Sequence, residues 1–194
     1  MKGNNKGLSL VELIVVIAIM AILIGIGTFS LSLLFGTQAK SCAQKVSAML
    51  SETKTGCMSR FDETMTLSYR KKVADSDPGY DPSVTSDGYY AENRVFTIKK
   101  DASLFEAAST QMRRMGSPRV VITVHLTDGT VFELGENNSI TVSFDRASGA
   151  FEEVMATVDG NPVTGYIDRM TFQSGLRTFT ITMVAETGKH TLQG

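Results

Sequence analysis

The feature that most constrains this chain is an uncharged stretch that runs from Leu13 to Ala39. It spans about 27 residues, and a helix needs roughly 20 apolar residues to cross the hydrocarbon core of a bilayer. Gly25 and Gly27 are the points inside it where a helix would be softest, and membrane helices tolerate glycine. No proline occurs before Pro78. We therefore expect residues 8–35 to form a transmembrane helix.

The pattern changes after Phe35, but no helix-breaking residue marks the change. Apolar or small residues now recur at steps of three and four, which predicts an amphipathic helix; they are Ala39, Cys42, Ala43, Val46, Met49, Leu50, Thr53 and Cys57. Residues 36–61 are therefore expected to continue the same helix, which would run from about Leu8 to about Phe61 and measure about 75 Å. Cys42 and Cys57 would lie roughly 22 Å apart on it, too far for a disulfide, so we expect two buried free thiols.

Residues 62–194 predict a separate, β-rich globular head. A loop rich in Asp, Pro, Gly and Ser occupies residues 75–88, and short β-branched and aromatic runs follow, separated by turn residues. These runs cover residues 95–98, 120–126, 131–134, 140–144, 170–172 and 178–184. The apolar spacing over Ser103–Met115 predicts one short helix, with Ser103 as its cap. The fold class is thus α+β, with a long helix packed on an antiparallel sheet.

Three interpretations of the N-terminus compete. A cleaved secretory signal has an apolar core of 7–15 residues, which is much shorter than the run found here. An uncleaved signal anchor fits better, because Lys2 and Lys6 would hold the N-terminus in the cytoplasm. That interpretation leaves Glu12 unexplained, since an acidic residue inside an apolar helix costs up to about 2.5–3.5 kcal/mol at the centre of the bilayer.

The third interpretation accounts for Glu12. The segment GLSLVEL at residues 7–13, followed by IVVIAIMAILIGIG, resembles the N-terminal signal of type IV pilins and type II secretion pseudopilins. This resemblance implies that residues 1–7 are a leader, that prepilin peptidase cuts between Gly7 and Leu8, and that Leu8 is then N-methylated. It also implies that Glu12 is the acidic residue used in filament assembly. Leu8 replaces the commoner phenylalanine, and the usual proline within the membrane helix is missing.

Electrostatics gives Glu12 a role that agrees with this resemblance. Cleavage would create a positive amine at Leu8, and helices stacked with a small axial stagger could place that amine beside Glu12 of the next subunit. An opposite charge offsets much of the cost of a carboxylate in apolar surroundings. Such a pair would fix the register between subunits, as a buried polar residue does in a coiled coil. The expected partners are therefore prepilin peptidase, other pilins or pseudopilins, and membrane lipid before assembly.

The head offers weaker clues to the subtype. Residues 140–149, a strand followed by a turn, resemble the GspH/FimT-like minor pseudopilins, and so do residues 175–189 near the C-terminus. The resemblance implies a single-pass protein of the cytoplasmic or inner membrane with its head outside the cytoplasm, which later joins a pilus or pseudopilus at the cell envelope. Protein secretion, DNA uptake and a surface pilus all remain open, as does a membrane-anchored sensor or enzyme.

Other candidate sites carry less weight. Asp75, Asp77, Asp81 and Asp87 crowd one loop, where carboxylates could ligate calcium, but Pro78 and Pro82 interrupt the spacing of a calcium loop. Basic residues cluster at 70–72, 99–100 and 113–114, but the formal net charge is −1, so the sequence does not favour a nucleic-acid partner. His125 and His190 lack metal-ligand spacing, and no serine lies in a nucleophile motif. We expect no enzyme activity and no cofactor.

Overall fold

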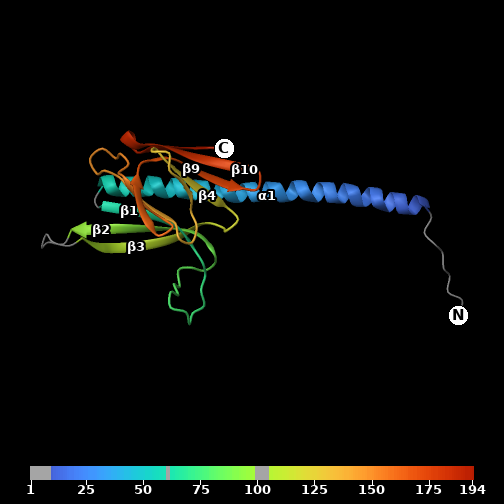
Figure 1. Ribbon diagram of the computed structural model, residues 1–194, viewed down its shortest axis with the longest axis horizontal. Coiled ribbons are helices and arrows are strands. Elements are labelled where there is room, and N and C mark those ends of the chain that lie inside the picture. The colour runs from blue at the N-terminus through green and yellow to red at the C-terminus, as the bar shows by residue number, and fades with distance from the viewer. Residues whose placement is uncertain (1–9, 60–61, 99–104) are drawn as a thin grey trace.

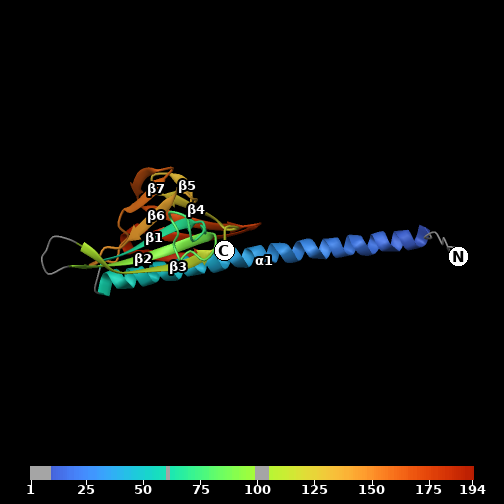
Figure 2. The same cartoon turned by 90° about the horizontal axis from the view of Figure 1, so that it is seen from below.

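One helix dominates the structure, a computed structural model that describes residues 10–59, 62–98 and 105–194. For residue 62 and residues 25–35, 97–98 and 105–109, it describes the backbone alone. Helix α1 (Leu10–Ser59) is 50 residues long and unbroken. Figures 1 and 2 show its C-terminal half lying against the head, while its N-terminal half projects away from the head. The single long helix expected from the sequence is confirmed over these residues.

The head is built from two antiparallel sheets. The six-stranded sheet has the order β3-β2-β1-β6-β7-β8, and the five-stranded sheet has the order β11-β10-β9-β4-β5. The first comprises β1 (Asp62–Arg70), β2 (Gly88–Ile98), β3 (Phe105–Gly116), β6 (Ser139–Ser143), β7 (Val154–Val158) and β8 (Asn161–Gly165). The second comprises β4 (Val121–Leu126), β5 (Val131–Glu133), β9 (Ile167–Ser174), β10 (Arg177–Val184) and β11 (Lys189–Gln193), with the 3₁₀ turn η1 (Ala185–Thr187) before β11. The α+β class with an antiparallel β-rich head is confirmed.

The core lies where the second half of α1 meets both sheets. The helix packs mainly against β10, β1, β9 and β3. All eight residues of the predicted apolar stripe, from Ala39 to Cys57, are buried. They meet buried side chains of the alternating strands, such as Met65 on β1, Phe172 on β9 and Ile181 on β10. Each large side chain buried in this way contributes roughly 1.5–3 kcal/mol, so this interface attaches the helix firmly to the head.

The helix predicted for Ser103–Met115 is wrong where the structure describes it. The segment forms strand β3, which pairs with β2 from Phe105↔Ile98 to Gly116↔Tyr89. The register shifts twice along this ladder, at Tyr89/Tyr90 and at Val95/Phe96. The apolar spacing within the segment misled the prediction, because pairing with another strand overrides a weak local preference for helix.

Two further strands are longer than the sequence suggested. The segment Asp62–Arg70, for which the sequence predicts no strand, forms β1 and runs between β2 and β6. Strand β2 begins at Gly88, seven residues before the run expected at Val95. The loop between β1 and β2 therefore ends where the sequence predicted, but strands flank it on both sides.

Both cysteines are buried thiols that form no disulfide, as expected. Burial raises the pKa of the Cys42 thiol to about 12, with Lys45 acting weakly in the opposite direction. The Cys57 thiol donates to the carbonyl oxygen of Glu63 at 3.1 Å. These thiols are packing residues of the helix–sheet interface.

Candidate processing and assembly site

The predicted processing residues lie at the beginning of α1. Gly7 and Leu8 fall outside the described residues, and the structure begins at Leu10. Glu12 lies in the first turn of α1 and is exposed. The amide groups at a helix N-terminus create a partial positive charge that favours a carboxylate there. Glu12 therefore stands at the one end of the apolar helix where a negative charge is best tolerated.

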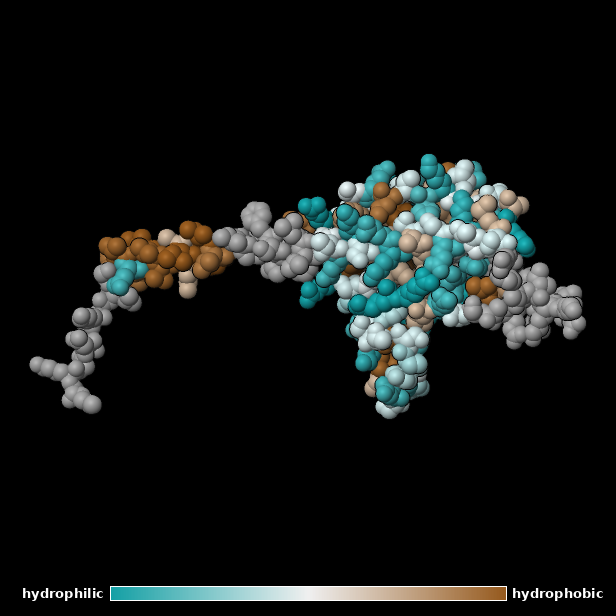
Figure 3. All heavy atoms as spheres, turned by 180° about the vertical axis from the view of Figure 1, so that it is seen from behind, coloured by the Kyte–Doolittle hydropathy of each residue, from teal (hydrophilic) through white to brown (hydrophobic). Residues whose placement is uncertain are grey.

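The helix beyond Glu12 presents apolar side chains in every direction. From Leu10 to Ile24, every large hydrophobic side chain is at least half exposed, with values from 50% to 75%. Figure 3 shows this part of the molecule as an almost uniformly hydrophobic surface beside a polar head. We call this exposed part of α1, Leu10–Ile24, the apolar rod. An apolar surface this extensive marks a contact with other proteins or with lipid.

A membrane crossing is a separate question. Within the part of the chain that the structure describes, no helix combines the length and the mean hydropathy that such a crossing requires.

The projecting part of α1 ends at Gly36, where the head begins to cover it. A Cβ on Gly36 would lie 2.9 Å from Cγ of Arg177, so the Arg177 side chain passes directly over this glycine. Two residues later the Ser117 hydroxyl donates to Oε1 of Gln38 at 2.8 Å. The β9–β10 turn and the β3–β4 loop of the head thus contact the helix near the point where its buried stripe begins.

The four aspartates of the proposed calcium loop are not drawn together. Asp81 accepts a hydrogen bond from the Ser83 amide at 2.8 Å and pairs with Arg70 at 3.4 Å. Asp87 accepts from the Lys72 amide at 2.9 Å. Across residues 10–59, 62–98 and 105–194, no group of three or more His, Cys, Asp or Glu side chains is placed to hold a metal ion. Asp81 and Asp87 are engaged in shaping the loop.

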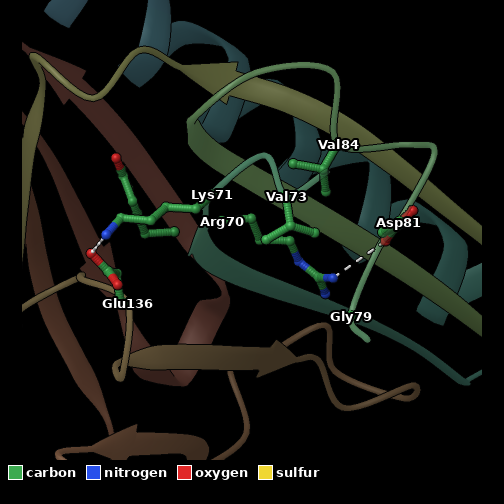
Figure 4. A pocket seen from close by; sticks show the side chains of 8 residues that line it. Arg70, Lys71, Val73, Gly79, Asp81, Val84 and Glu136 are labelled. Carbon is green, nitrogen blue, oxygen red and sulfur yellow. Dashed lines mark hydrogen bonds and ion pairs between the residues drawn. The ribbon is translucent and has the colours of Figure 1, made fainter. Parts of the chain in front are cut away.

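A hollow of about 290 Å³ lies between this loop and the sheet (Figure 4). Its charged side chains pair with one another: Lys71 contacts Glu136 at 2.5 Å, and Arg70 reaches Asp81 on one side and Glu92 on the other. The hydrogen bond to Glu136 raises the pKa of Lys71. Because these charges offset each other, the hollow has no surplus charge that would select an ionic ligand.

The basic clusters are used in similar pairs. Arg113 makes a two-pronged contact with Glu52 of α1, at 2.7 and 3.0 Å. Arg114 donates to the carbonyl oxygen of Asp87 at 3.1 Å. Lys99 and Lys100 lie outside the described residues. The described clusters therefore connect elements of the head to one another and to α1.

The two histidines occupy different settings. His190 on β11 lies on α1, with Nε2 3.1 Å from Oγ of Ser51 and 3.0 Å from the carbonyl oxygen of Ser47. His125 on β4 lies beside Arg169 and Asp168, and its pKa is lowered by burial and by the Arg169 charge, against a smaller opposite effect of Asp168. Sequence reasoning did not anticipate that His190 attaches the last strand to the helix.

Comparison with known proteins identifies the N-terminal segment alone. The family model described as the prokaryotic N-terminal methylation motif matches residues 2–28. No curated protein and no solved structure matches the chain. The matched segment contains Gly7, Leu8 and Glu12 and overlaps the exposed apolar rod. The chain therefore carries a type IV pilin-like prepilin signal, which implies processing by prepilin peptidase and assembly with other pilins.

Proposed function

We propose that this chain is a filament subunit of the prepilin type. Prepilin peptidase cuts it between Gly7 and Leu8 and methylates the new amine of Leu8. Residues 8–35 hold the precursor in the cytoplasmic membrane and later pack against the same segment of other subunits. The observation that supports this most directly is the exposed apolar rod with Glu12 in its first turn, located within the segment that matches the methylation motif.

The apolar rod suits both proposed stages, which are storage of the precursor in the membrane and packing of the mature subunit in the filament. A helix that is apolar on all sides is stable only when lipid or other helices surround it. Cleavage after Gly7 would remove Lys2 and Lys6, and the next lysine or arginine in the sequence is Lys40. The new amine of Leu8 is then the positive charge nearest to Glu12 along the mature chain. Pairing between Leu8 of one subunit and Glu12 of its neighbour would set the axial register of the filament.

We place the protein among the minor pseudopilins of a type II secretion system or a related type IV pilus or competence system. The supporting features are the segments Ile140–Gly149 and Gly175–Lys189, where a strand runs into a turn, as in GspH/FimT-like proteins. Mass spectrometry of sheared filaments tests this placement through the ratio of this subunit to the main filament protein. A ratio far below one supports a minor subunit, and a ratio near one contradicts it.

The primary experiment is mass spectrometry of the intact chain after expression with and without prepilin peptidase. With the peptidase, the expected product begins at Leu8 and carries one extra methyl group on its amine. Without the peptidase, the chain should keep residues 1–7. Gly7→Ala changes the proposed cut site. Gly3→Ala is its matched control, because Gly3 lies in the same leader but outside the cut site.

An unprocessed N-terminus in the presence of active peptidase would contradict the proposal and favour a membrane-anchored sensor or enzyme. A cut at another position would also contradict it. Neither outcome depends on knowing which secretion or pilus system the subunit serves.

A further inference from the structure

We propose that the turn between β9 and β10 is a membrane-contact site, in which Leu176 enters the bilayer interface while Arg177 and Arg119 bind anionic lipid headgroups. This would seat the head against the membrane at a fixed height before assembly. The inference rests on the proposed function, because it requires residues 8–35 to lie in the bilayer.

Leu176 is the most exposed large hydrophobic residue described. Its exposed fraction is 94%, although it lies in a hairpin whose neighbours Ser174 and Phe179 are buried. Gly175 and Leu176 are the two residues between the paired positions Ser174 and Arg177. Gly175 has φ of 61°, as the first central position of a type II′ turn requires. A type II′ turn does not require leucine at its second central position, and the Leu176 side chain contacts little of the head.

The turn lies at the membrane-facing end of the head. Figures 1 and 2 show β9 and β10 running along α1, with their shared turn pointing toward the N-terminal half of the helix. The Arg177 side chain passes over Gly36. This position is one residue beyond Phe35, where the proposed membrane segment ends. Leu176 therefore lies level with the expected boundary between lipid and water.

A second loop brings another cation to the same place. The Ser174 hydroxyl donates to the carbonyl oxygen of Arg119 at 3.2 Å, which holds the β3–β4 loop beside the turn. Arg119 and Arg177 are both exposed, and Lys40 is exposed on the next turn of α1.

Acidic residues are absent from the sequence of the three segments that meet here, which are the part of α1 around Gly36, the β3–β4 loop and the β9–β10 turn. None occurs from Leu13 to Ser51, from Ser117 to Thr127, or from Arg169 to Ala185. This end of the head thus combines one projecting apolar side chain with nearby cations. An apolar residue that enters the acyl boundary, beside arginines that reach the phosphates, is the arrangement by which proteins bind an anionic membrane surface. A neighbouring protein surface would not require cations at this position along α1, so lipid is the occupant that the arrangement fits best.

The test uses tryptophan fluorescence, because the chain contains no tryptophan. Full-length Leu176→Trp is purified in detergent and reconstituted into vesicles of phosphatidylcholine and phosphatidylglycerol with brominated acyl chains. We expect its emission to shift to the blue and to lose intensity through bromine quenching. Vesicles of phosphatidylcholine alone should give less quenching.

Two further tryptophan variants and two double arginine variants make the result interpretable. Val131→Trp places the probe on β5, at an exposed hydrophobic position of the head (55%), beside the end of β4 that lies away from the turn. Its emission should not be quenched. Leu23→Trp places the probe in the apolar rod and reports insertion of the helix itself. Arg119→Gln with Arg177→Gln should reduce the quenching of Leu176→Trp on phosphatidylglycerol vesicles, and Arg119→Lys with Arg177→Lys should restore it.

The outcomes separate the two proposals. If Leu23→Trp is not quenched, the helix is not in the bilayer and the membrane stage of the proposed function is overturned together with this inference. If Leu23→Trp is quenched but Leu176→Trp behaves like Val131→Trp, the membrane-contact site alone is overturned. A blue shift of Leu176→Trp that ignores brominated lipid and grows with protein density would indicate contact with a second copy, and would also overturn it.

Discussion

Glu12 is the residue on which the assembly proposal depends most directly. Removing one member of a charge pair buried among apolar groups costs about 3–5 kcal/mol. Because each 1.4 kcal/mol is tenfold, Glu12→Ala and Glu12→Gln should lower filament incorporation by about 100-fold or more. The precursor should still fractionate with the membrane, since the apolar run is intact. Immunoblots of sheared filaments and of membrane fractions measure both effects.

The control for this prediction is Glu52→Gln on the same helix. Glu52 is exposed in the packed half of α1 and pairs with Arg113, so its loss should cost at most about 1 kcal/mol of stability and leave incorporation unchanged. Normal incorporation of Glu12→Gln would refute the pairing between Leu8 and Glu12. Equal loss in both variants would show a general defect instead.

Cys42 gives the protein a defined sensitivity to alkaline pH. Burial raises the pKa of its thiol to about 12 and that of the Tyr89 phenol also to about 12, and both groups are neutral when protonated. The unfolded chain ionises them at lower pH, near 9 for the thiol and 10 for the phenol. These two groups should therefore leave the free energy of unfolding constant below pH 9 and lower it between pH 9 and 12.

Denaturant titrations from pH 7 to 11 measure this effect, and Cys42→Ala and Tyr89→Phe should each flatten the alkaline slope. At pH 8, iodoacetamide should leave Cys42 of the folded chain unmodified and alkylate it in urea, because the thiolate is the reactive species. Rapid alkylation of Cys42 in the folded state would contradict its burial under the sheet.

At the scale of elements, the sequence predicted those parts of the fold that a local pattern determines. Helix α1 was expected from about Leu8 to about Phe61 and is described from Leu10 to Ser59. Its first half is an unbroken apolar run, and its second half repeats apolar residues with helical spacing. Strand β3 was predicted as a helix for the same reason, since Phe105, Met112 and Met115 also follow that spacing. Its real determinant is the ladder with β2, and such a partner cannot be read from spacing within one segment.

The packed half of α1 should tolerate exposed substitutions and reject buried ones. Leu50 is fully buried against the sheets, so Leu50→Ala should lower the free energy of unfolding by about 2–5 kcal/mol. Gln44→Ala, on the exposed side of the same helix, should change it by less than about 0.5 kcal/mol. Urea unfolding of the full chain in mild detergent, followed by circular dichroism, compares the two. Equal effects would show that the helix does not anchor the head.

For the whole molecule, the sequence located the N-terminal site but not what surrounds it. Gly7, Leu8 and Glu12 follow from a short local pattern, and the match at residues 2–28 supports the prepilin signal that they form. The sequence placed Leu176 only within the strand-and-turn resemblance of residues 175–189 and gave it no role of its own. The signal was present, since a leucine between a turn glycine and an arginine has no structural need there. Only the packing of Arg177 on Gly36 shows that this leucine lies where the rod leaves the head.

The division of the molecule at Gly36 leads to a prediction about truncation. Residues 36–194 retain every buried residue of the α1 stripe, from Ala39 to Cys57, and lose the exposed apolar rod. This fragment should be monodisperse without detergent and should unfold cooperatively at nearly the temperature of the full chain in detergent, as followed by light scattering and circular dichroism. Residues 51–194 lose Val46, Met49 and Leu50, three buried side chains that together contribute about 4.5–9 kcal/mol. Because that is a large share of the 5–15 kcal/mol by which a domain is usually stable, this shorter fragment should fail to fold. A folded 51–194 fragment would mean that the sheets form a core without the helix, and an aggregating 36–194 fragment would mean that the head needs the rod.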